Sequence, residues 1–118
     1  MKRRFRLTRS TDFQRVRRIG KSYAHPLVVL LVAPNEIEQV RIGVVAGRAV
    51  GTAVQRNRAK RQMRACIDRF LPCLTTGRDL VFLSRKPMGQ AGFPEICAAI
   101  QALLKRSGIL DERPQPQQ

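Results

Sequence analysis

The side chains able to carry out acid–base or metal chemistry are few and scattered in this sequence of 118 residues. Its acids are Asp12, Glu36, Glu38, Asp68, Asp79, Glu95, Asp111 and Glu112, and its one histidine is His25. A nuclease that uses two metal ions needs carboxylates that converge on one point. A metal-free nuclease usually needs a pair of histidines or an equivalent acid and base. We therefore expect no catalytic residue in this chain.

The cysteines do not predict a metal site either. Cys66, Cys73 and Cys97 form no CxxC pair, and His25 is distant in sequence. A zinc site needs four ligands at close spacing, so we expect none. The odd number of cysteines argues against a disulfide framework. Cys66 and Cys97 fall on the apolar faces of predicted helices, where a small buried thiol is the ordinary interpretation.

The charge of the chain predicts an anionic partner. The formal net charge is +15, with 23 basic and 8 acidic residues. Residues 1–64 hold 16 basic and 3 acidic residues, a net of +13, so the charge is polarised. Nucleic acid fits such a distribution. A membrane fits less well, because the longest apolar run, residues 27–33, is too short to span a bilayer and no signal-peptide core follows the basic start. We expect a cytoplasmic protein.

The hydrophobic pattern predicts an α/β two-layer sandwich with the order α-β-β-α-β-α and a small mixed sheet. The first two strands are expected to form a hairpin. The predicted helices cover residues 8–20, 53–71 and 94–106, and the predicted strands cover residues 22–33, 40–46 and 78–86. Residues 1–107 are expected to form one domain, and residues 108–118 a disordered tail.

The helix at 53–71 carries five cations within residues 55–65, and residues 53–67 contain no acid. A face that only meets solvent normally interleaves glutamates with its cations. On a helical wheel the apolar face consists of Ala59, Met63, Cys66, Ile67 and Phe70. The far side consists of Asn57, Arg58, Arg61 and Arg64. Arg56 and Lys60 fall toward the apolar side, which predicts a second basic surface turned toward the sheet.

The first helix adds an aromatic residue among cations. Phe13 has five basic neighbours between residues 9 and 21. Aromatic side chains among cations suit single-stranded nucleic acid, whose bases stack while its phosphates pair. The alternative, that Phe13 is an ordinary core residue, stays open from the sequence.

The segment RIGVVAGRAVGTAVQRNRAKRQMRA (41–65) resembles the signature of the bacterial ribonuclease P protein subunit. The flanking segments RLTRSTDFQRVRRIG and GRDLVFLSRKP agree, so the resemblance covers residues 3 to about 107. It implies a left-handed βαβ crossover and a basic partner for a catalytic RNA. That RNA, with its own magnesium ions, would remove the 5′ leader of precursor tRNA. The implied partners are the catalytic RNA and precursor tRNA, with no membrane and no further protein required.

The resemblance also implies roles for individual residues. The leader would lie in a cleft between the first helix, the sheet and the Arg-Asn-Arg helix, facing Phe13, Arg17, Leu31, Arg56, Asn57 and Lys60. The catalytic RNA would face Arg48, Arg58, Arg61 and Arg64. The sequence departs from the family at Arg17 and Leu31, where the family often has aromatic residues.

Three other functions stay open at this point. A general RNA-binding module of the ribosomal or chaperone type would show basic surfaces without a preference for a leader. A stand-alone nuclease would use His25 with Glu36 or Glu38 as acid and base. A helix-turn-helix protein would bind double-stranded DNA, but strands separate the helices of this chain, which disfavours it.

Overall fold

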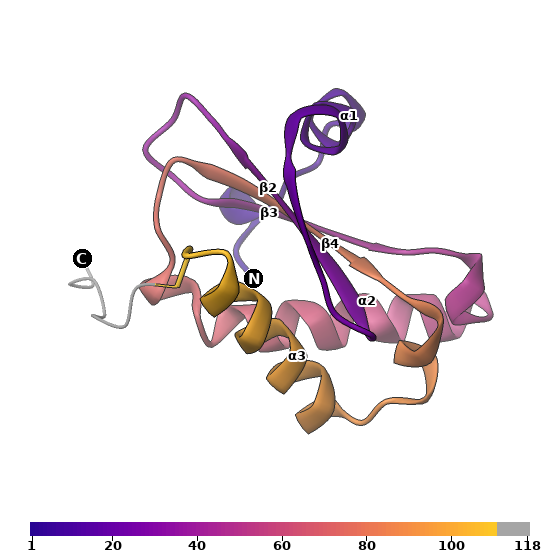
Figure 1. Ribbon diagram of the computed structural model, residues 1–118. Helices are drawn as coiled ribbons and strands as arrows, with labels where there is room; N and C mark the ends of the chain where they lie inside the picture. Colours follow the sequence, from indigo (N-terminus) through magenta and orange to yellow (C-terminus); the bar gives the residue numbers. More distant parts are fainter. Residues whose placement is uncertain (111–118) are drawn as a thin grey trace.

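The computed structural model describes residues 1–110 and contains a four-stranded sheet with helices on both faces. Helix α1 lies on one face, and helices α2 and α3 lie on the other (Figure 1). The helices are α1 (Ser10–Ile19), α2 (Ala53–Asp68) and α3 (Phe93–Arg106). The strands are β1 (Lys21–Ala24), β2 (Val28–Pro34), β3 (Arg41–Ala46) and β4 (Arg78–Ser84). The predicted α/β class and mixed sheet are therefore confirmed.

The predicted strand at 22–33 is folded into two strands. The chain reverses direction at His25. The ring Nδ1 of His25 accepts a hydrogen bond from the backbone N–H of Leu27 at 3.1 Å, and the backbone N–H of His25 donates to Val28 O at 3.0 Å. Pro26, between them, has no N–H to offer a ladder. β1 therefore folds back on β2 as an antiparallel edge strand.

The sheet order is β1-β2-β4-β3. β4 is antiparallel to β2 and parallel to β3, and α2 lies on the connection between β3 and β4. The expected hairpin of the strands at 22–33 and 40–46 is therefore wrong, because β4 pairs between them. The paired residues are 38 apart between β3 and β4 and 44 to 56 apart between β2 and β4, and local sequence signals do not report such distant pairing.

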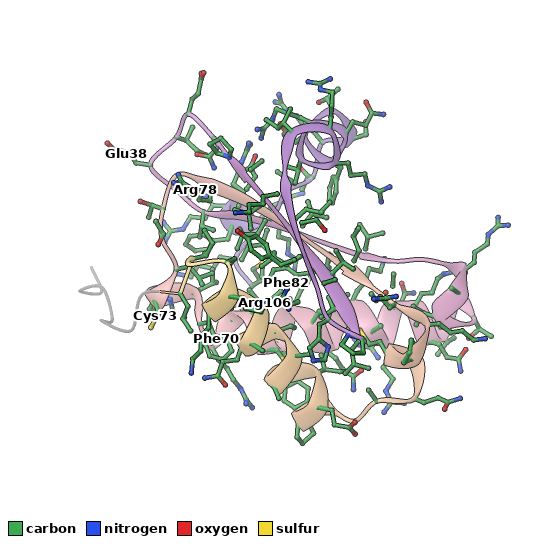
Figure 2. The ribbon with its side chains drawn as sticks, in the orientation of Figure 1. Glu38, Phe70, Cys73, Arg78, Phe82 and Arg106 are labelled. Carbon is green, nitrogen blue, oxygen red and sulfur yellow. A yellow bond between two sulfur atoms is a disulfide. The ribbon has the colours of Figure 1, made fainter. Side chains whose placement is uncertain are left out.

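The main core lies between the sheet and the helices α2 and α3, with Phe82 of β4 at its centre (Figure 2). Most of the apolar face predicted for the helix at 53–71 is buried there, which confirms that assignment; the buried residues are Ala59, Met63, Cys66 and Ile67. Helix α3 buries Ile96, Ile100, Leu103 and Leu104 in the same core. A smaller core lies under α1 on the other face and consists of Leu7, Val16, Leu31, Ala33 and Val81.

Cys66 and Cys97 form a disulfide that joins α2 to α3, with 5.2 Å between their Cα atoms. The expectation of two buried free thiols is therefore wrong. The apolar faces that carry the two cysteines pack against each other, a contact between positions 31 residues apart that the sequence pattern does not show. Cys73 is the free cysteine of the described residues.

The folded part of the chain continues beyond the expected boundary at residue 107. Ile109 is buried, its carbonyl accepts a hydrogen bond from Thr75 N at 2.9 Å, and Leu110 forms a β-bridge with Leu74. The rest of the expected tail, residues 111–118, lies outside the described residues. None of the helices within residues 1–110 has the length and apolar character needed to cross a membrane.

Candidate nucleic-acid interface

The ring of Phe13 lies over Gly43, the one residue without a side chain in a row of three residues across the sheet. The register places Leu31, Val81 and Gly43 side by side across β2, β4 and β3, on the face that α1 covers. A Cβ added to Gly43 would lie 2.5 Å from Cζ of Phe13, so the ring occupies the space above that glycine. Phe13 is half-buried, and Val16, one turn further on, is fully buried.

The next row on the same face is left partly uncovered by α1. Val29, Leu83 and Val45 stand side by side in the register of β2, β4 and β3, and all three are half-buried. We call these three residues the apolar strip. Arg17, one turn after Phe13 on α1, is exposed. Leu31, by contrast, is 8% exposed beneath α1 and supports the ring of Phe13 from below rather than offering a free surface.

A surface pocket of about 740 Å³ lies beyond the apolar strip, at the end of the sheet. Arg85 follows β4 directly, and its N–H donates to Leu27 O at 2.8 Å, so sheet-like pairing reaches the pocket. The pocket is lined by Ala24, His25, Pro26, Ala49, Ser84, Arg85, Lys86 and Pro87. Arg85 and Lys86 were not selected from the sequence. The signal that could have identified them is two adjacent cations at the end of a strand, with the exposed Arg48 as a further cation.

The start of α2 is fixed by side chains. Thr52 caps the helix, with Oγ1 accepting from Gln55 N at 3.3 Å, while Oε1 of Gln55 accepts from Thr52 N at 2.7 Å. Gly51 precedes this capping box with φ +140°, a conformation that side chains disfavour. A Cβ there would also lie 2.7 Å from Cδ of Gln55. The cap at Thr52 fixes the residue at which α2 begins, and so the direction in which each cation of the helix points.

The α2 cations separate into two groups by burial. Arg56, Lys60 and Arg64 are half-buried and lie four residues apart, and we call them the inner row. Asn57, Arg58 and Arg61 are exposed, and we call them the outer face. The grouping differs from the wheel assignment at Arg64, which was expected to point outward with Arg58 and Arg61. Its position one turn after Lys60 keeps it at the flank of the helix.

Arg64 shares its surroundings with a second cation. Burial, and then the positive charge of Arg6, lower the pKa of Arg64 from its ordinary value. Arg6 reaches this place because the first residues run along the free edge of β3, where Arg6 forms a β-bridge with Ile42 and Leu7 N donates to Ile42 O at 2.8 Å. Like charges so placed favour an anion between them. The sequence pattern had not selected Arg6.

The cations of α2 have no acidic partner among residues 1–110. The acids nearest the middle of the fold are engaged elsewhere. Asp79 pairs with Arg15 and with Arg41, and Asp12 lies 3.6 Å from Arg41. Both groups of α2 cations therefore stand unneutralised in the described structure, as a surface for polyanions would.

The two predicted surfaces come from helices on opposite faces of the sheet. Phe13, Arg17 and the apolar strip lie on the α1 face of the sheet, whereas α2 packs on the opposite face. They approach each other around β3, one of the two edge strands of the sheet. Arg64 of the inner row lies at that edge, beside Arg6, and Lys60 and Arg56 follow one and two turns back along α2.

The residues that a stand-alone nuclease would use as acid and base do not lie close together. His25 lies in the turn before β2, and Glu36 and Glu38 lie in the turn after it, where Figure 2 labels Glu38. The seven residues of β2 separate the two turns by roughly 20 Å. Within residues 1–110, no three His, Cys, Asp or Glu side chains gather as they would around a metal ion.

A basic α+β domain whose α2 arginines have no acidic partner within residues 1–110 fits the class of RNA-binding proteins. Comparison with known proteins gives the family. The family model described as Ribonuclease P matches residues 1–108. The chain therefore belongs to the ribonuclease P protein family.

Individual relatives agree with the family match. The ribonuclease P protein component of Herpetosiphon aurantiacus is 39% identical over 118 residues, which is 100% of this chain and 96% of that protein. The component of Chloroflexus aggregans is 42% identical over 111 residues, covering 93% of this chain and 82% of that protein. Among solved structures, the RNase P protein of Thermotoga maritima has a TM-score of 0.78 at 30% identity, covering 86% and 96% of the two chains. The RNase P protein of Staphylococcus aureus has a TM-score of 0.85 at 26% identity, covering 91% and 98%.

Membership agrees with the expectation that this chain needs no catalytic residue of its own. The ribonuclease P protein component is a subunit of an RNA-based endoribonuclease that acts in tRNA processing. Its partner in this ribonucleoprotein is an RNA, and no catalytic residue is needed in the protein.

Proposed function

We propose that this chain binds the catalytic RNA of ribonuclease P and the 5′ leader of precursor tRNA. It thereby assists the endonucleolytic removal of the leader that produces the mature 5′ end of the tRNA. In this proposal the RNA supplies the active site and holds the magnesium ions. The cytoplasm, where we expected the protein from its sequence, is the proposed place of action.

The observation that carries the leader assignment is the pairing of Phe13 with the apolar strip. A half-buried aromatic ring beside uncovered apolar sheet surface offers bases a place to stack, and the exposed Arg17 offers a cation for phosphates. Arg85 and Lys86 continue the basic surface at the pocket. We define the leader surface as Phe13, Arg17 and the apolar strip, with Leu31 as the support beneath it.

Arg58 and Arg61 of the outer face of α2 are the proposed contacts for the catalytic RNA. Arg58 and Arg61 are exposed and have no acidic partner among residues 1–110, and arginine matches phosphate geometry with two parallel hydrogen bonds. Arg48, exposed before α2, belongs with them. At the β3 edge the inner row lies between the two surfaces. We assign Arg56, Asn57 and Lys60 to the leader where it passes that edge, and Arg64 with Arg6 to an RNA phosphate.

The test is a cleavage assay on precursor tRNA at magnesium concentrations where the catalytic RNA alone is slow. Three mixtures are compared: the protein alone, the catalytic RNA alone, and both together. We expect no cleavage by the protein alone and cleavage at the mature 5′ end by the mixture. Cleavage by RNA-free protein, or no stimulation by the protein, would overturn the proposal.

A second measurement separates leader recognition from general RNA binding. The assembled ribonucleoprotein is titrated with precursor tRNA and with the same tRNA lacking its leader. We expect tighter binding of the precursor in the presence of the protein than with the RNA alone. Equal gains for both ligands would favour the general RNA-binding module instead.

A further inference from the structure

Asp79 is the one charged side chain within residues 1–110 that is fully buried, and it holds four elements together. It lies in β4, and the register places it between Ala33 of β2 and Arg41 of β3, on the face that α1 covers. Nε and Nη2 of Arg41 donate to its two oxygens at 2.9 and 2.8 Å. Nδ2 of Asn35, in the turn after β2, donates to Oδ1 at 2.9 Å.

Arg15 is the partner of Asp79 that comes from α1. Its Nη2 donates to Oδ2 of Asp79, and its Nη1 donates to Pro34 O at 2.9 Å. The guanidinium of Arg15 therefore binds α1 both to β4 and to the end of β2. The ion pair between Asp12 and Arg41 adds a second, longer contact on the same flank of the helix.

The position of Arg15 on α1 links the Arg15–Asp79 contact to the position of Phe13. At about 100° per residue, Val16 lies about 60° from Phe13 on one side and about 100° from Arg15 on the other. Val16 is fully buried and touches the sheet at the middle of the helix. Rotation of α1 about Val16 that lowered one flank would lift the other. Rotation in either direction would therefore stretch or compress the Arg15–Asp79 ion pair, so this contact fixes the rotation of α1 at which Phe13 lies over Gly43.

From this geometry we infer that Asp79, acting through Arg15, is a positioning residue for the leader surface. Its role is to hold α1 at the rotation that keeps Phe13 over Gly43. Neither Arg15 nor Asp79 touches RNA in this arrangement. The inference rests on the proposed function, because it assigns the contact to leader recognition.

The experiment compares Arg15→Met with Arg18→Met in the assembled ribonucleoprotein. Both changes remove one cation from α1 and keep an unbranched apolar stem, but Arg18 is exposed and faces away from the sheet. The readout is the ratio of affinities for precursor and for leaderless tRNA, with the protein saturating. We expect Arg15→Met to reduce this ratio by roughly tenfold, the size of one lost base stack, and Arg18→Met to leave it near the wild-type value.

Two further readouts separate positioning from direct contact and from general destabilisation. The double variant Phe13→Ala with Arg15→Met should be no worse than Phe13→Ala alone, because Arg15 acts through Phe13. The salt dependence of precursor binding should not flatten in Arg15→Met, since its charge is neutralised inside the protein. Arg15→Lys, which keeps the ion pair, should retain most of the discrimination.

The outcomes distinguish the two levels of the proposal. If Phe13→Ala loses discrimination but Arg15→Met behaves like Arg18→Met, the positioning role is overturned and the leader surface stands. Additive losses in the double variant, or a flattened salt dependence, would make Arg15 a direct RNA contact and overturn it as well. If Phe13→Ala itself loses nothing, the proposed leader surface fails first.

Discussion

The ring of Phe13 lies against the backbone of Gly43, with 2.5 Å between Cζ and the position that a methyl group on that glycine would take. The contact joins the middle of α1 to the edge strand β3. It depends on the absence of a side chain at one position, so the aromatic residue and the glycine work as a pair.

Adding a methyl group at Gly43 should therefore disturb the leader surface. Gly43→Ala is expected to lower the free energy of unfolding by roughly 1–3 kcal/mol through overpacking and to weaken precursor binding relative to leaderless tRNA. Gly47→Ala is the stability control, because a Cβ there meets nothing within 4 Å. Urea unfolding measures both variants. Equal stability of the two would show that the ring moves aside at no cost.

Stability should fall in acid through Asp79. Burial alone would raise the pKa of Asp79, but the hydrogen bonds from Arg41 and Asn35 and the charges of Arg41 and Arg15 outweigh it, so the pKa lies below its ordinary value. As pH falls, the unfolded chain takes up this proton first, at about pH 3.9, the usual pKa of aspartate. The contribution to stability is complete above that pH and is lost as pH falls through the folded pKa.

Urea unfolding between pH 7 and pH 2 tests this dependence. Asp79→Asn should be less stable at pH 7 by roughly 1–3 kcal/mol, and its stability should fall less below about pH 4. Glu36→Gln, at an exposed position in the turn after β2, should keep the wild-type profile. If the stability of Asp79→Asn falls with pH in parallel with that of the wild type, Asp79 is not the source of the acid sensitivity.

The two groups of α2 cations should differ in what they bind. Assembly with the catalytic RNA should weaken with salt, with a slope of log K against log salt of roughly −4 to −5 if about six cations contact phosphates. Arg58→Ala and Arg61→Ala should each flatten that slope by close to one unit and leave leader discrimination intact once assembly is saturated. Lys60→Ala should do the reverse. If every variant weakens both assembly with the catalytic RNA and leader discrimination, the α2 cations form one undivided basic surface.

Arg64 and Arg6 offer a separate test, because they are proposed to share one phosphate. The double variant Arg6→Ala with Arg64→Ala should weaken RNA binding by less than the sum of the single variants. The free protein should lose little stability in either single variant, since each removes a repulsion between like charges. Fully additive losses would place the two arginines on different phosphates.

The Cys66–Cys97 disulfide should be visible as a difference between reducing and oxidising conditions. The bond closes a loop of 31 residues, so reduction should lower the free energy of unfolding by roughly 2–4 kcal/mol. Thermal unfolding with and without a thiol reductant measures the change, and Cys73→Ser removes the free cysteine as a competing partner. Three titratable thiols in the denatured, unreduced protein would contradict the bond.

Local signals in the sequence predicted the local features of this fold. The apolar face of α2 and its unneutralised cations both follow from residues within a few turns of one another. The pairing of β4 between β2 and β3 and the Cys66–Cys97 bond do not, because they join distant segments.

The candidate site divides in the same way. The motif at 41–65 placed the cations on the right helix, but Arg64 is paired with Arg6 by the chain's path along β3, which no spacing encodes. The burial of Leu31 and the uncovered apolar strip depend on how far α1 extends over the sheet. Arg15 and Asp79, 64 residues apart, meet only once the sheet has formed.

The placement of α1 and α2 on opposite faces of the sheet has a thermodynamic consequence for a protein that binds two polyanions. Helices packed on the two faces have axes roughly 20 Å apart, about twice the screening length at physiological salt. Phosphates held on the outer face of α2 therefore repel phosphates on the leader surface only weakly. We expect the two binding free energies to be nearly additive, so that the sheet serves as an electrostatic spacer between the catalytic RNA and its substrate.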